Sequence, residues 1–126
     1  MPRQNLSTFT DAYIECACWS SSDDAGVPLD QIDAPLSNEA LTLMRDDCRA
    51  FFLANESLIL DDNCIAAGGL SSVIMAGHDF WLSRNGHGAG FWDGDWKEPF
   101  ATALDNAAKS FDECDLYVGD DGKIYI

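Results

Sequence analysis

The sequence lacks any long apolar segment. No run of apolar residues approaches the roughly eighteen needed to cross a bilayer, and Met1 to Asn5 lack the hydrophobic region of a signal peptide. The chain also lacks a CxxC pair, and its five cysteines form an odd set. Cys16-x-Cys18 could join the two histidines in a zinc site, but the spacing matches no common zinc motif. We expect a cytoplasmic protein with free thiols, no membrane segment, no metal and no cofactor.

Basic residues are scarce. The chain has 7 basic and 22 acidic residues, most of them aspartate, and a net charge of -15. From its length we expect a diameter of about 36 Å, and a DNA duplex that long carries about 21 phosphate charges. Direct binding to nucleic acid is disfavoured by repulsion. Two interpretations remain open: the charge serves only solubility, or it imitates a nucleic acid.

Apolar residues are abundant despite this charge. They make up 47% of the chain, and 11% of the chain is aromatic, which is typical of a globular protein and not of an acidic disordered chain. The 126 residues predict a single domain, 1–126, with enough apolar surface for a core. We expect residues 1–7 to form a flexible arm.

Helical periodicity recurs along most of the chain. Thr8 or Thr10 can cap a first helix that ends near Trp19, and Ser37 can cap the clearest one. Asp61-Asp62-Asn63 predicts a turn before a short helix at 64–67. Two further helices are expected from about Ser71 to Leu82, with an apolar stripe of Leu70, Val73, Ile74, Gly77, Trp81 and Leu82, and from Pro99 to about Ser110.

The C-terminal residues predict a β-hairpin. Leu116 to Val118 and Lys123 to Ile126 flank the turn residues Gly119-Asp120-Asp121-Gly122. Because two strands alone are only marginally stable, a third is expected, and Gly90-Phe91-Trp92 is the candidate. The predicted fold is α+β: a small antiparallel sheet with this C-terminal hairpin, covered by four to five helices.

One segment, His78 to Trp96, concentrates unusual residues. It contains both histidines, three of the four tryptophans and four of the ten glycines. Asn85-Gly86 is expected to end the preceding helix, because both residues tolerate the left-handed conformation. Two interpretations are open for the rest: a glycine-rich connector pinned by aromatic residues, or a small-molecule or catalytic site.

This segment also carries a resemblance. The run from His78 to Asp93, with Tyr13-Ile14-Glu15-Cys16 and Trp19-Ser20-Ser21 before it and Leu116 to Tyr125 after it, resembles a family of small acidic proteins encoded by phages and mobile elements. Ser83 stands where that family usually has threonine. The motif residues are His78, Asp79, Trp81, Arg84, Asn85, His87, Trp92 and Asp93. The resemblance implies a phage protein in the cytoplasm of a bacterial host. Small acidic phage proteins are often inhibitors of host defence, including anti-CRISPR and anti-restriction proteins.

Charge and resemblance together lead to the principal hypothesis. The protein is expected to be an anti-CRISPR inhibitor, an acidic mimic that blocks DNA binding by a CRISPR surveillance complex through its basic surface. The partner-binding residues are expected in the densest acidic run, which comprises Asp23, Asp24, Asp30, Asp33, Asp46, Asp47, Asp61 and Asp62.

Two alternatives come from the central segment. In an enzyme, His78 and His87 would act as general acid and base, Asp79 or Asp93 would orient an imidazole, and an anion would be held by Arg84 or Asn85. In a regulatory phage protein, an exposed aromatic surface around Trp92 and Trp96 would bind the partner.

Overall fold

The computed structural model describes residues 2–23, 25–65, 71–86, 90–91 and 96–126. Its described elements are four α-helices, two 3-10 turns and a two-stranded antiparallel sheet, so the α+β class is confirmed and the helix number is at the low end of the prediction. In order these are α1 (Pro2–Ser20), η1 (Leu29–Gln31), α2 (Asn38–Asn55), η2 (Asp61–Asn63), α3 (Ser72–Asn85), α4 (Phe100–Lys109), β1 (Tyr117–Val118) and β2 (Ile124–Tyr125).

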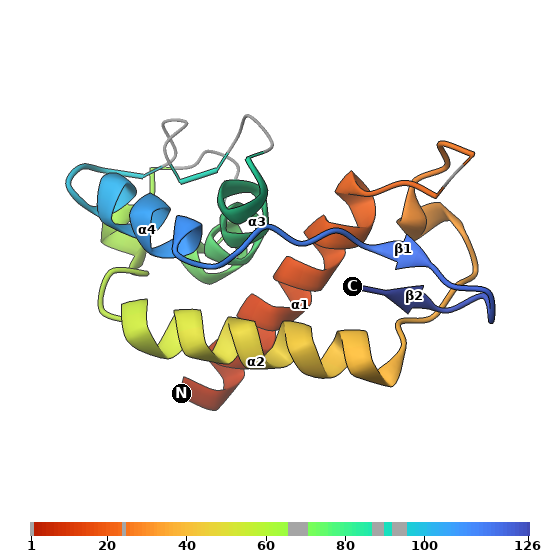
Figure 1. Ribbon diagram of the computed structural model, residues 1–126. Helices are drawn as coiled ribbons and strands as arrows, with labels where there is room; N and C mark the ends of the chain where they lie inside the picture. Colours follow the sequence, from red (N-terminus) through yellow and green to blue (C-terminus); the bar gives the residue numbers. More distant parts are fainter. Residues whose placement is uncertain (1, 24, 66–70, 87–89, 92–95) are drawn as a thin grey trace.

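The helices surround a core in which α3 is central. The helix α1 packs most extensively against α3, and α3 also contacts α4 (Figure 1). None of the helices among the described residues is long and apolar enough to span a membrane. The hairpin lies at one end of the molecule, beside the segment that joins α1 to α2 (Figure 1).

Aromatic rings form the middle of the core. Phe51 of α2 stacks on Phe80 of α3 with ring centroids 4.2 Å apart, and Phe9 and Tyr13 of α1 lie within 6.0 Å and 5.0 Å of Phe80. Phe91 is fully buried and its ring lies 5.8 Å from that of Phe51, so it belongs to the same core.

The N-terminal helix begins earlier than expected. Residues 2–7 belong to α1, so the helix start predicted at Thr8 or Thr10 is too late. Proline at the second position suits the first turn of a helix, where its missing N–H is not needed. Leu6 is half-buried against the core one turn before Phe9, which extends the apolar face of α1 toward its start.

Capping predictions at α2 and α3 are confirmed. The Ser37 hydroxyl accepts a hydrogen bond from the Ala40 N–H at 3.0 Å, and Ser71 caps α3 in the same way. Gly86 ends α3 with a φ of 65°, as the Asn85-Gly86 pair predicts. In α4, Asp105 forms an ion pair with Lys109, one turn later, at 2.9 Å.

The predicted apolar stripe of α3 is confirmed only in part. Gly77 and Trp81 are buried, but Val73, Ile74 and Leu82 are only half-buried. Leu70 lies outside the described residues, and Phe80 and the polar Asp79, which the stripe did not include, are buried. The reason is that α1 and α4 both pack on α3, so most of its circumference is enclosed and no single stripe faces the core.

The hairpin is confirmed, but its third partner is not the predicted one. Gly90 and Phe91 are not in a strand, and Trp92 lies outside the described residues. Instead, Ile124 donates its N–H to the Pro35 carbonyl and accepts from the Ser37 N–H, each at 2.8 Å. The residues just before α2 therefore pair with β2 through a parallel bridge between Leu36 and Ile124, in place of the predicted third strand.

The expected short helix at 64–67 is not formed at its start. Cys64 forms an antiparallel bridge with Trp96, and residues 66–70 lie outside the described part. The preceding turn is present as η2, Asp61–Asn63.

Candidate functional site

The predicted acidic residues fall into three separate places. Asp23, Asp30 and Asp33 lie in the segment between α1 and α2, near the hairpin (Figure 1). Asp46 and Asp47 lie in the middle of α2, and Asp62 lies in η2 beyond the far end of that helix. Asp24 and the side chain of Asp61 lie outside the described part. An 18-residue helix is about 27 Å long, so the chain does not gather these residues into one patch.

The carboxylates on α2 are matched by positive charge. Asp47 forms an ion pair with Arg84 at 2.8 Å, and Asp46 lines a depression together with Asp11, Arg45 and Arg49. Arg45 and Arg49 therefore lie beside the carboxylates of Asp11 and Asp46. This part of the surface is mixed in sign.

The hairpin gathers carboxylates without such compensation. We use the term hairpin end for the surface of β1, β2, their turn and the segments beside them, with the carboxylates of Asp23, Asp33, Glu39, Asp115, Asp120 and Asp121. Asp23 and Tyr117 line one depression, and Glu39 acts electrostatically on Tyr125. In sequence, residues 21–44 and 110–126 contain one basic residue, Lys123.

Two of these carboxylates, those of Asp23 and Asp121, also accept hydrogen bonds that stabilise the turns of this surface. Asp23 Oδ1 accepts hydrogen bonds from the Ala25 and Val27 N–H groups, each at 2.9 Å. Asp121 accepts from the Tyr125 hydroxyl at 2.6 Å, which lowers the pKa of Asp121 and raises the pKa of Tyr125 to about 12. Both turns are therefore fixed by hydrogen bonds to aspartate side chains.

The densest acidic run in the sequence does not include four of the six carboxylates of this surface. Glu39, Asp115, Asp120 and Asp121 stand outside the densest acidic run, and they join Asp23 and Asp33 only because β2 pairs with the chain entering α2. The available signal was the hairpin turn itself, which contains two of the aspartates.

The central motif is used mainly to hold the fold together. Asp79 is 2% exposed and accepts a hydrogen bond from Trp96 Nε1 at 2.8 Å, and Trp81 Nε1 donates to Ser20 at 2.8 Å. Asn85 accepts from the Cys114 N–H at 2.7 Å. His87, Trp92 and Asp93 lie outside the described residues.

Arg84 is the most connected residue of the motif. Its guanidinium donates twice to the Asp112 carbonyl, at 3.0 and 2.5 Å, and once each to Tyr13 and Asp47. It also lies 5.6 and 5.4 Å from the ring centroids of Phe80 and Phe111. All these groups belong to the protein, so the guanidinium is already occupied and is not available to hold an anion.

The described part of the expected acid–base site is not assembled. His78 and Asp79 point to different neighbours, because Asp79 binds Trp96 whereas His78 faces Glu15. Trp96 is 3% exposed, so it does not contribute to an exposed aromatic surface. Within the described residues, no three His, Cys, Asp or Glu side chains are placed to hold a metal ion.

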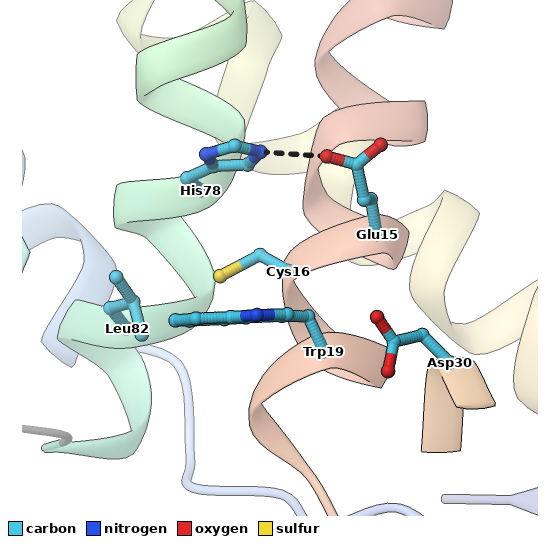
Figure 2. A pocket seen from close by; sticks show the side chains of 6 residues that line it. All are labelled: Glu15, Cys16, Trp19, Asp30, His78 and Leu82. Carbon is cyan, nitrogen blue, oxygen red and sulfur yellow. Dashed lines mark ion pairs between the residues drawn. The ribbon is translucent and has the colours of Figure 1, made fainter. Parts of the chain in front are cut away.

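A pocket of about 460 Å³ lies between α1 and α3. It is lined by Glu15, Cys16 and Trp19 of α1, His78 and Leu82 of α3, and Asp30 of η1 (Figure 2). Burial, and then the nearby carboxylates of Asp79 and Glu15, raise the pKa of the Cys16 thiol to about 12. A thiol held in its protonated form is a poor nucleophile, so the pocket is suited to binding rather than to covalent catalysis.

Comparison with known proteins gives no further guide to this site. No protein-family model, curated protein or solved structure matches the chain.

Proposed function

We propose that the protein is an inhibitor that occupies a basic, nucleic-acid-binding surface of a host defence complex, with the hairpin end as its contact surface. The observation that supports this proposal is the composition of the segments that pack together at the hairpin end. Residues 21–44 and 110–126 carry all of its carboxylates, and Lys123 is their one basic residue. Charge of one sign on one face favours fast, salt-sensitive association with a face of the opposite sign.

The phage setting and the target rest on the resemblance of the central motif to small acidic phage proteins. A CRISPR surveillance complex is the proposed target, since it binds DNA through a long basic channel. The proposed action is blocking of that channel, with carboxylates standing where DNA phosphates would lie.

The capture of a partner tests this function. We expect the tagged protein, added to a nuclease-treated bacterial lysate that contains a CRISPR surveillance complex, to recover that complex at low salt and to lose it at high salt. The recovered subunits would be identified by mass spectrometry. Recovery of no partner at low salt would contradict the proposal.

Neutralising the hairpin end should weaken this binding more than neutralising other acids. The variant combines Asp33→Asn, Glu39→Gln, Asp115→Asn and Asp120→Asn, and it leaves intact Asp23 and Asp121, whose hydrogen bonds fix the two turns. Exposed ion pairs contribute about 0.2–1 kcal/mol each, so we expect the dissociation constant to rise about tenfold or more. Affinity for the captured complex would be measured by surface plasmon resonance.

A matched variant separates position from total charge. Asp11→Asn, Asp46→Asn, Glu56→Gln and Asp62→Asn remove the same four charges from other parts of the described surface. We expect this control to change the dissociation constant by less than about threefold. Equal weakening by both variants would show that only net charge matters and would remove the hairpin end from the proposal.

A further inference from the structure

The pocket between α1 and α3 exposes the most unusual apolar side chain of the described surface. Trp19 is 63% exposed, whereas Trp81 and Trp96 are buried. Its position is set by helix spacing: Glu15 and Trp19 lie one turn apart on α1, opposite His78 and Leu82, which lie one turn apart on α3 (Figure 2). An exposed tryptophan inside a depression is typical of a binding site rather than of a random surface position.

The walls of this pocket differ in chemistry. Figure 2 shows the Trp19 indole edge-on, with Cys16 next to one of its faces and His78 and Glu15 beyond Cys16. Glu15 and Asp30 bring two carboxylates to one side, and Leu82 lies on the other. A ligand that fits must combine a flat, weakly hydrated surface with positive charge.

His78 supplies a third polar group. Its Nε2 atom is buried and lacks a hydrogen-bond partner among the described residues, since Glu15 Oε1 is 3.5 Å away, too far for a good hydrogen bond. The described lining therefore offers the carboxylates of Glu15 and Asp30 as acceptors, and its one basic group is that histidine.

We propose that this pocket binds an arginine side chain of the partner protein, with the guanidinium stacked on Trp19 and hydrogen-bonded to Glu15 and Asp30. The planar guanidinium stacks on indole faces and carries N–H donors in the plane of the stack, which a lysine ammonium does not. This inference rests on the proposed function, because a basic nucleic-acid-binding surface is rich in arginine. Asp30 already belongs to the predicted partner-binding residues, and here it acquires a specific role.

A titration with a single arginine tests the pocket without the partner. The full-length ¹⁵N-labelled protein is titrated with N-acetyl-arginine amide while the indole N–H signal of Trp19 is followed by NMR. We expect saturable, millimolar binding with shifts concentrated at Trp19, Glu15 and His78. N-acetyl-citrulline amide has the same shape without the charge and should produce no saturable shift.

Variants of the pocket decide which groups hold the ligand. Glu15→Gln with Asp30→Asn should weaken binding about fivefold or more, whereas Glu56→Gln with Asp11→Asn should leave it unchanged. Trp19→Phe should retain part of the affinity that Trp19→Ala loses. Equal binding of citrulline, equal binding of N-acetyl-lysine amide, or shifts located away from Trp19 would overturn the assignment of an arginine pocket.

The experiments distinguish a failure of the arginine pocket from a failure of the proposed inhibitor function. If the captured complex binds wild type and the Trp19→Ala variant equally, the arginine pocket is overturned as a partner site while the inhibitor proposal stands. If the amino-acid titration succeeds but no complex is captured, the pocket stands as an arginine-binding site and the inhibitor proposal fails.

Discussion

Replacing Gly77 by alanine is expected to destabilise the fold by about 3 kcal/mol. A Cβ atom at this position would lie 2.5 Å from the Phe9 carbonyl oxygen and 2.8 Å from the Ala12 Cβ. Neither neighbour can rotate away, so α1 and α3 would have to separate along their main interface. This loss of stability is expected even though alanine has a higher helix propensity than glycine, by about 1 kcal/mol.

Urea unfolding of Gly77→Ala, monitored by circular dichroism, measures this effect. Gly86→Ala is the matched control, since Gly86 ends the same helix with a φ of 65° and a Cβ there would meet no atom within 4 Å. The control isolates backbone strain and is expected to cost about 1 kcal/mol. A Gly77→Ala variant as stable as wild type would show that α1 and α3 are not in such close contact.

Replacing Arg84 by alanine is expected to cost about 3 kcal/mol, because its buried guanidinium holds several hydrogen bonds and an ion pair with the half-buried Asp47. The loss leaves the Asp112 carbonyl and the Tyr13 hydroxyl without their donors and leaves Asp47 without its ion-pair partner. Cavity formation beside Phe80 and Phe111 adds to the cost.

Two further variants show which part of Arg84 matters. Arg84→Lys keeps the charge but cannot reach all the acceptors, so an intermediate loss of stability is expected. Arg49→Ala removes an exposed arginine from α2 and should change the free energy of unfolding by less than about 0.5 kcal/mol. A loss at Arg84 no greater than that at Arg49, measured by thermal unfolding, would contradict a central role for this network.

Local signals in the sequence predicted the parts of the fold that depend on neighbouring residues. Ser37 identified the start of α2, Asn85-Gly86 identified the end of α3, and Gly119 to Gly122 identified the hairpin turn. Each of these features is determined by hydrogen bonds or backbone angles within a few residues, so the sequence pattern contains the necessary information.

Features that depend on distant residues could not be predicted. The third partner of the sheet is Pro35 to Ser37 because Ile124 pairs with it across nearly 90 residues, and no periodicity indicates that choice. Burial of Asp79 and Arg84 similarly depends on Trp96, Tyr13 and Asp112. From sequence alone these two polar residues suggested a catalytic group and an anion site.

The two candidate binding surfaces also depend on residues that are distant in the sequence. Charge composition predicted an acidic binding protein, but the residues of the hairpin end come from segments that only the sheet brings together. The pocket joins Trp19 to His78, 59 positions later, through the packing of α1 on α3. Neither helix alone contains a signal for a cation site.

Competition with DNA tests the central claim, that the hairpin end occupies a nucleic-acid-binding surface. Fluorescently labelled target DNA is bound to the captured complex, and its anisotropy is followed as the protein is added. We predict that wild type displaces the DNA, that its potency falls as salt rises, and that the hairpin-end variant is about tenfold weaker than the variant with four charges removed elsewhere. Simultaneous binding of DNA and protein to the complex, with no change in anisotropy at saturation, would contradict the claim.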